Sequence, residues 1–204
     1  MARLPSVLDL DDLPLAELCA ARLDGEVMPI GAGWCPIDEP DLPSLRAASV
    51  SPRLPPPFVV ERRSAAWVHG ALPAPPPVAE CCVPHSARVA IRSLPAGMLL
   101  REVAIEAADI VVIGGIRCTT VHRTVYDLVR DADPARDAVD IVAALLTSDR
   151  SAGHAVRARL ERAHRLPHKA AALARLTSAE IVAAGPPSVV AARPRVADQP
   201  SLTR

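Results

Sequence analysis

Apolar and polar positions along this chain follow helical spacing in some segments and strand-like alternation in others. Apolar residues recur at helical spacing over 13–23, which predicts a short helix there. Residues 26–37 have the composition of two short strands around a glycine turn. A second short helix is expected at 41–48, and the proline-rich stretch 51–57 is expected to be a linker.

The middle of the chain combines one strand-to-helix unit with several strands. Residues 59–70 predict a strand that leads into a helix, for which Ser64 is a suitable N-cap. Three further strands are expected, at 78–83, 88–92 and 98–105. The run 110–113 is apolar throughout, so it is expected to be a strand buried on both faces.

Helices are expected to dominate the C-terminal third of the chain. Thr119 or Thr120 is expected to cap a helix that runs to about Arg130. Pro134 follows an aspartate that suits a cap, and it is expected in the first turn of a helix that runs to about Leu146.

The last predicted helix carries a concentration of basic side chains. It is expected over 151–176 with a bend at Pro167, and the residues after Gly185 are expected to be disordered. Its basic side chains are Arg157, Arg159, Arg162, His164, Arg165, His168 and Lys169. Two interpretations stay open. The series is either a surface for nucleic acid or an acidic partner, or the solvated face of an amphipathic helix that buries Val156 and Leu160.

The composition fits a protein with a mostly aliphatic core. Half of the 204 residues are hydrophobic, but only 2% are aromatic. The formal net charge is zero, which argues against a protein that binds nucleic acid through charge alone. Together with the predicted elements, these features indicate an α+β fold, in which a small mixed or antiparallel sheet is flanked by helices.

The five cysteines are irregularly spaced and match no disulfide scaffold. The sequence has no recognisable signal peptide, and no apolar stretch reaches the roughly 18 residues of a membrane helix, so a cytoplasmic protein with reduced thiols is expected. The candidate zinc ligands are Cys81, Cys82, His85, Cys118 and His122. Because neighbouring cysteines on a strand point to opposite faces, and the spacing fits no zinc motif, buried thiols without a metal are expected instead.

Two sequence motifs carry a family resemblance. The first is Ser64-Ala-Ala-Trp-Val-His-Gly-Ala71, and the second is Gly115-Ile-Arg-Cys-Thr-Thr-Val-His-Arg-Thr-Val-Tyr-Asp-Leu128. In order and separation they resemble the C-terminal domain of AbiEi-type antitoxins, which belong to type IV toxin–antitoxin pairs, over about residues 59–148. The chain departs from the family pattern at Cys118, where valine is usual, and at Val121, where proline is usual.

The resemblance implies an antitoxin that counters a nucleotidyltransferase-type toxin and that needs no stable complex with the toxin to do so. Such proteins often repress their own operon through an N-terminal winged helix, of which only the last helix and the wing have counterparts here. The implied regions are a partial winged-helix-like segment and linker (1–57), an antitoxin-like α/β domain (58–148), a basic helical extension (149–184) and a disordered tail (185–204).

The motif residues singled out as structural are Trp67, His69, Gly70, Thr119, Thr120, Arg123, Thr124 and Asp127. Arg123 and Asp127 lie four residues apart on one helical face. They are expected to form a partly buried pair that fixes the helix to the sheet, rather than a charge that faces a partner. The threonines are expected to cap the helix rather than to hold a phosphate. His69 is a candidate general base, but it has no nucleophile or carboxylate beside it in sequence.

No catalytic constellation is recognisable, so no enzyme activity, cofactor or small-molecule substrate is expected. The first alternative is a stand-alone DNA-binding transcriptional regulator that contacts phosphates through Arg157, Arg159 and Arg162. The second is the remnant of a restriction-endonuclease-like protein. Such a nuclease needs a carboxylate cluster beside a lysine, whereas residues 149–204 hold four scattered acids and a single lysine, Lys169.

Overall fold

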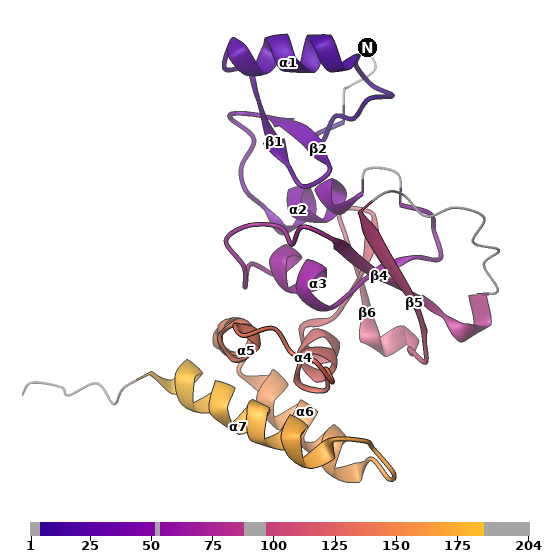
Figure 1. Ribbon diagram of the computed structural model, residues 1–204, viewed down its shortest axis with the longest axis vertical. Coiled ribbons are helices and arrows are strands. Elements are labelled where there is room, and N and C mark those ends of the chain that lie inside the picture. The colour runs from indigo at the N-terminus through magenta and orange to yellow at the C-terminus, as the bar shows by residue number, and fades with distance from the viewer. Residues whose placement is uncertain (1–4, 52–53, 88–96, 186–204) are drawn as a thin grey trace, which may run out of the picture.

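The computed structural model describes residues 5–51, 54–87 and 97–185. In Figure 1 the chain runs from helix α1 at one end, through a central sheet, to helices α6 and α7 at the other end. The fold is α+β, as the sequence predicts, with sheets flanked by helices. The strand predicted at 88–92 and the tail predicted beyond Gly185 lie outside the described residues.

The N-terminal part consists of a helix, a hairpin and a second helix. Helix α1 spans Leu15–Leu23, strands β1 (Val27–Ile30) and β2 (Gly33–Pro36) pair antiparallel, and helix α2 spans Pro43–Val50. These bounds agree with the predicted helices and strands to within about two residues. An isolated bridge from Leu8 to Trp34 adds a short third segment to the hairpin.

Helix α1 is held to the hairpin by little buried surface. Leu18 is fully buried, but Leu15 is 56% exposed and Leu23 is 89% exposed. The hairpin itself is fixed at its tip, where the amide of Ala32 donates to the carbonyl of Ser49 in α2 at 2.8 Å. Gly31 has a positive φ of 54°, and a Cβ added there would lie 2.3 Å from the same carbonyl, so only glycine fits this approach.

The central sheet has five strands in the order β5-β4-β3-β7-β6. Its strands are β3 (Val59–Val60), β4 (Ala79–Pro84), β5 (Met98–Val103), β6 (Ile110–Ile113) and β7 (Ile116–Thr119). The pairs β3–β4 and β6–β7 are antiparallel, whereas β3–β7 and β4–β5 are parallel, so the sheet is mixed.

The prediction that 110–113 is buried on both faces is wrong. β6 is an edge strand of the sheet, and Val112 on it is 64% exposed. The four residues are apolar, but only one neighbouring strand and one covered face are available to them. An apolar run therefore identified a strand here without identifying its place in the sheet.

Five helices surround or follow the sheet in the described residues. They are α3 (Arg62–Val68), α4 (Val121–Val129), α5 (Ala138–Ser148), α6 (Ser151–Arg162) and α7 (Lys169–Ala184). Ser64 is not the N-cap of α3. The helix starts at Arg62, two residues before Ser64, and Glu61 occupies the N-cap position. The hydroxyl of Ser64 instead accepts a hydrogen bond from the amide of Glu80 in β4 at 2.9 Å.

The C-terminal helices differ from the sequence prediction in two ways. Helix α5 starts at Ala138 with Asp137 at its N-cap, so Pro134 lies ahead of the helix instead of in its first turn. The single bent helix predicted over 151–176 is in fact two helices, separated by residues 163–168. His168 has a left-handed backbone conformation with φ 56°, which no helix interior adopts.

Two main clusters of buried side chains form the core. One lies between the sheet and helices α2 and α3 and includes Trp67, Val60 and Cys81. The other is formed by α4, α5, α6 and α7 and includes Leu145 and Leu160. Helices α6 and α7 therefore share a core with α4 and α5. Within the described residues, no helix is both long and apolar enough to cross a membrane.

Candidate functional site

The first motif ends where helix α3 meets strand β7. Trp67 is buried in the sheet core, and Gly70 takes a left-handed φ of 86° just beyond the helix. His69 Nε2 donates to the carbonyl of Thr119 at 2.7 Å, which joins the two motifs directly. Burial lowers the pKa of His69, and the hydrogen bond to Thr119 offsets this only in part. His69 is thus a neutral structural donor between α3 and β7, since a carbonyl accepts only from a protonated nitrogen.

The three motif threonines are all engaged at the start of α4. The hydroxyl of Thr120 accepts from the amide of Arg123 at 3.2 Å, which is the predicted N-cap. Thr124 Oγ1 donates to the carbonyl of Thr120 at 2.9 Å, so the 2.7 Å contact between Thr119 Oγ1 and Thr124 Oγ1 takes its proton from Thr119. All three hydroxyl groups therefore form hydrogen bonds within the fold at the start of α4, which favours helix capping over a phosphate site.

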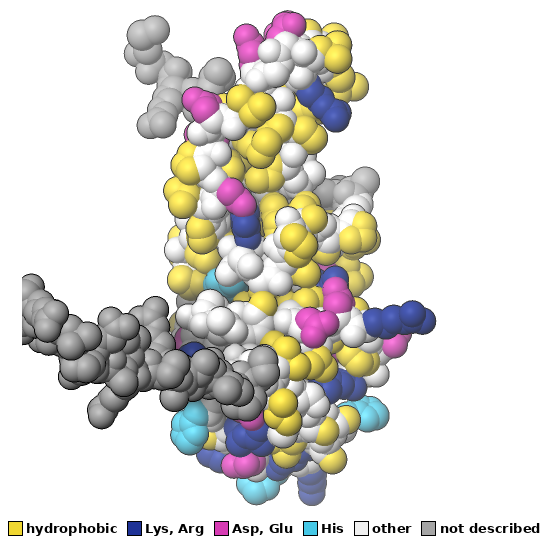
Figure 2. Space-filling model, turned by 90° about the vertical axis from the view of Figure 1, so that its left-hand side faces the viewer, with side chains coloured by type: hydrophobic (Ala, Val, Ile, Leu, Met, Phe, Trp, Pro, Cys, Tyr) yellow, Lys and Arg dark blue, Asp and Glu magenta, His cyan; other side chains and the backbone are white. Residues whose placement is uncertain are grey.

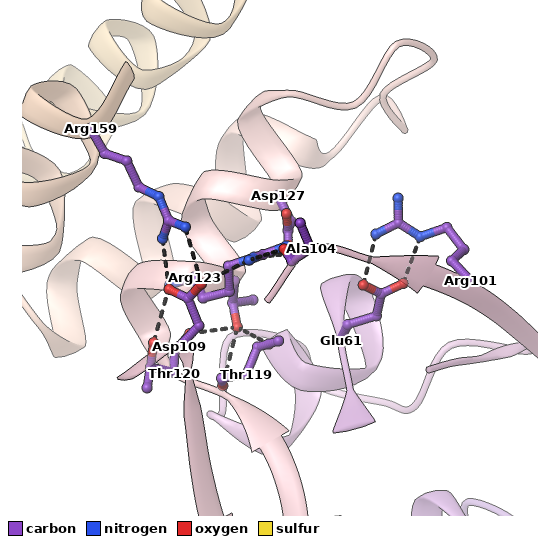
Figure 3. A network of polar contacts seen from close by, with 10 residues as sticks. Glu61, Arg101, Ala104, Asp109, Thr119, Thr120, Arg123, Asp127 and Arg159 are labelled. Atoms are coloured by element: carbon purple, nitrogen blue, oxygen red, sulfur yellow. Dashed lines mark hydrogen bonds and ion pairs between the residues drawn. The ribbon is translucent and has the colours of Figure 1, made fainter. Parts of the chain in front are cut away.

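Arg123 and Asp127 form the pair that their spacing predicts, and both are buried. Arg123 Nε donates to Asp127 Oδ2 at 2.8 Å, and its terminal nitrogen donates to the carbonyl of Ala104 at 3.1 Å and to Asp109 Oδ2 at 2.8 Å (Figure 3). The guanidinium therefore fixes α4 to the chain between β5 and β6. Burial raises the pKa of Asp127, and the hydrogen bond from Arg123 opposes that rise.

Asp109 joins two arginines from different helices. Arg159 on α6 binds it with two bonds, to Oδ1 at 2.6 Å and to Oδ2 at 3.0 Å, while Arg123 on α4 shares Oδ2 (Figure 3). Burial acts to raise the pKa of Asp109, but the hydrogen bonds from Arg159 and Arg123 outweigh it and lower the pKa below its usual value. The sequence analysis did not single out Asp109, whose only signal was its position directly before an apolar run.

Tyr126 lies on the same side of α4 as this cluster. The guanidinium carbons of Arg159, Arg130 and Arg123 lie 4.4, 4.7 and 5.9 Å from the centroid of its ring. Such positions allow cation–π attraction between each arginine and the ring. Three positive charges thus gather around one tyrosine that is 8% exposed. Neither Tyr126 nor Arg130 was a candidate from sequence.

A second buried ion pair lies at the start of α3. Glu61 is 1% exposed, and Arg101 on β5 donates to both of its oxygens at 2.7 Å (Figure 3). Arg62 and Arg63, which follow Glu61 in the chain, also form ion pairs. Arg62 pairs with Asp131 at 3.1 Å, and Arg63 binds Asp137 at 2.6 Å. Glu61 thus joins the start of α3 to β5, and the two arginines join α3 to the chain between α4 and α5. None of these pairs was predicted.

The basic series on the last two helices is largely used within the fold. Arg157 pairs with Glu180 on α7, Arg159 binds Asp109, and the Lys169 ammonium caps α6 by donating to the carbonyls of Glu161 and Ala163. Arg162 and Arg165 remain exposed. Figure 2 shows basic side chains and histidines gathered at the α6–α7 end of the molecule. The fold therefore accounts for Arg157, Arg159 and Lys169, and it leaves Arg162 and Arg165 on the surface.

His122, Ser151 and Asp149 come together at the start of α6, although the sequence analysis found no such group. His122 Nε2 lies 3.1 Å from both Ser151 Oγ and Asp149 Oδ2. In a Ser-His-Asp relay the carboxylate holds the other ring nitrogen, so this arrangement lacks that geometry. Asp149 also accepts from the amide of Ser151 at 3.0 Å, which is typical of a helix start. The hydrogen bonds from Ser151 contribute most to the lowered pKa of Asp149.

The candidate zinc ligands do not gather in the part of the chain that the structure describes. Cys81 and Cys118 lie on either side of Val60 in the sheet, and Cys82 points to the opposite face from Cys81. His85 is exposed. Among the described residues there is no group of three or more metal-binding side chains. Burial raises the pKa of Cys81 to about 12, so this thiol stays protonated and unreactive.

A pocket runs along the α4–α6 side of this region. It has a volume of about 640 Å³ and is lined by His69, Asp109, Thr120, His122, Arg159 and Arg162, among others. It therefore contains residues of both motifs and of the basic series. No known protein family matches the chain, and no curated protein is similar enough to it to count as a relative.

Proposed function

We propose that this protein is an antitoxin-type regulator that counters a nucleotidyltransferase-type toxin, as the resemblance to AbiEi-type antitoxins implies. One observation carries the proposal. The two motifs behind the resemblance, 51 residues apart from Ser64 to Gly115 in the sequence, pack into one unit, in which α3 contacts both α4 and β7. The 2.7 Å bond from His69 to Thr119 joins them.

The role of most motif residues in this proposal is to build the unit, not to touch a partner. Arg123, Asp127 and Thr124 are buried and fully engaged, so they give the surface its shape without contributing to it. In this proposal, recognition of a partner depends on exposed side chains. The exposed arginines of the basic series are Arg162, at the pocket lined by residues of both motifs, and Arg165, in the loop after α6.

The proposal treats the protein as a regulator without catalysis of its own. Its support is the geometry of His122, Ser151 and Asp149, in which one imidazole nitrogen serves both partners. Operon repression is a secondary part of the proposal. The N-terminal helix and hairpin offer a wing, but α1 and the turns beside it carry acidic side chains such as Glu17, Asp24 and Glu26, which repel phosphate.

The test is growth rescue by co-expression with a nucleotidyltransferase-like reading frame that neighbours this gene. The full chain is expected to restore growth, and the R162E/R165E variant is expected to lose most of the rescue while it remains folded. R136E is the matched control, because Arg136 is exposed in the loop before α5 and lies outside the pocket. Absence of rescue by soluble, folded full chain would contradict the proposal.

The stand-alone DNA-binding alternative makes a separate prediction. It requires salt-dependent binding of the purified protein to its own promoter, which R162E/R165E would weaken. The variant used for this test must leave Arg157 and Arg159 intact, because those side chains are held in ion pairs within the fold. Promoter binding without growth rescue would favour this alternative over the antitoxin.

A further inference from the structure

A second cavity shares Arg159 and Glu106 with the pocket described above. Its volume is about 470 Å³, within the range of small-molecule sites. Arg123, Arg130 and Arg159 line it together with Tyr126. Pro84, Val103 and Ile105 supply apolar lining, and Ser86 and His85 supply polar groups from the short turn after β4.

Two of the three arginines at this cavity form ion pairs within the fold. Arg123 and Arg159 are neutralised by Asp109 and Asp127, so three guanidiniums face two carboxylates. Arg130 is the uncompensated one. In the described part of the chain its Nε is buried without a hydrogen-bond partner, and its guanidinium lies over Tyr126 at 4.7 Å. The neighbouring acid, Asp131, is already paired with Arg62.

An unpaired guanidinium at a cavity is a favourable place for an anion. A guanidinium with no carboxylate beside it attracts an oxyanion, which brings both negative charge and hydrogen-bond acceptors. Guanidinium groups bind phosphate and carboxylate through parallel N–H donors. Arg123 and Arg159 are already held in place by their carboxylates, so little ordering is needed when an anion binds.

We propose that this cavity binds a phosphate group, with Arg130 as the main ligand and Arg159 and the hydroxyl of Ser86 beside it. The phosphate belongs either to inorganic phosphate or to a nucleoside monophosphate, since the cavity extends well past the volume of a single phosphate over Val103 and Ile105. Glu106 also lines the cavity and is exposed. Its carboxylate repels the ligand and limits its affinity.

The experiment titrates the purified full chain with inorganic phosphate and, separately, with adenosine monophosphate, by isothermal calorimetry at low ionic strength. Saturable binding is expected. R130Q is expected to weaken it about tenfold or more, and E106Q is expected to tighten it severalfold because it removes the repelling charge. R136Q removes one exposed arginine elsewhere and is expected to leave the affinity unchanged.

The two sources of phosphate are separated by their relative affinities. Adenosine monophosphate that binds at least tenfold more tightly than inorganic phosphate indicates a nucleotide site, and equal affinities indicate a site for the phosphate alone. The proposal is overturned if neither ligand saturates, or if R130Q and R136Q weaken binding equally. Because E106Q lies on an exposed residue, it tests the site even if R130Q fails to fold. These readouts are independent of the growth rescue that tests the antitoxin role.

Discussion

The two ends of this protein are built in different ways. In the hairpin unit (residues 5–36), helix α1 buries a single side chain, Leu18, and its leucines at 15 and 23 are mostly exposed. In the main body (the described residues from 43 to 184), two large clusters of buried side chains are joined by ion pairs between sheet and helices. Buried contacts are therefore concentrated in the main body, and the hairpin unit is held to it mainly by docking to α2.

This difference bears on the proposed function. A winged helix needs two helices ahead of the wing to support the helix that enters the major groove. In the described residues the hairpin unit has one helix, and that helix is lightly packed. The motifs behind the antitoxin proposal all lie in the main body, so variants that disturb one region are expected to leave the other region's properties largely intact.

The largest effect is expected from Asp109→Ala in the main body. The change leaves Arg159 without its carboxylate and Arg123 with Asp127 and the carbonyl of Ala104. Arg123 is buried, so its lost ion pair is not replaced by water. Removing one member of a buried ion pair typically costs about 3–5 kcal/mol. Urea unfolding monitored by circular dichroism measures this loss. A loss below about 1 kcal/mol would show that the cluster contributes little to stability.

The next prediction uses the two tryptophans, one in each region, as separate probes. Trp34 lies in the hairpin and Trp67 is buried in the main body. Leu18→Ala is expected to lower the urea midpoint reported by Trp34 in a W67F background, because it removes the only buried side chain of α1. The midpoint reported by Trp67 in a W34F background is expected to stay unchanged. Leu160→Ala is the matched control. It is expected to lower the free energy of unfolding reported by Trp67 by about 2–5 kcal/mol.

A smaller effect is expected from pH at the junction of the two motifs. Burial lowers the pKa of His69 in the folded protein. Below the ordinary histidine value of about 6.5, the unfolded chain takes up a proton that the folded chain does not, so stability falls as the pH falls. His69→Gln retains a donor for the carbonyl of Thr119 but cannot titrate in this range. Urea unfolding at about pH 7.5 and 5.5 should show a shallower fall for the variant, and equal falls would contradict the assignment.

The smallest effect is expected from Asp41→Ala, at an ion pair on the surface. Asp41 binds Arg46, but its side chain is 59% exposed. Pairs of this kind contribute about 0–1 kcal/mol. The variant therefore serves as the exposed counterpart of Asp109→Ala in the same unfolding assay. A cost that matched that of Asp109→Ala would remove the distinction between the buried and exposed pairs.

The elements with regular spacing could be predicted from the sequence, because periodicity reports how a segment meets its immediate surroundings. Helix α4, its cap at Thr120 and the pair Arg123–Asp127 all follow from residues within one or two turns of each other. Strand β6 was found for the same reason. Its exposure on the edge depends on which strands pair with it, and that is not a local property.

The contacts that organise the site could not be predicted, because they join residues far apart in the chain. Asp109 and Arg159 are separated by 50 positions, and each has an ordinary local explanation, one before a strand and one on a basic helix. The buried position of Glu61 was missed for a similar reason, since its partner Arg101 is 40 residues away. The break between α6 and α7 was seen only as a bend at Pro167, because helical spacing continues on both sides of it.

The arrangement around Asp109 also has an evolutionary consequence. The carboxylate of Asp109 binds arginines from both α4 and α6. Substitution of Asp109 would therefore remove an ion-pair partner from both arginines. Substitution of either arginine would weaken the selection that maintains the acid. Positions 109, 123 and 159 are therefore expected to vary as a set among homologous chains. These three correlated positions could then be used to identify distant homologues whose overall sequence similarity is low.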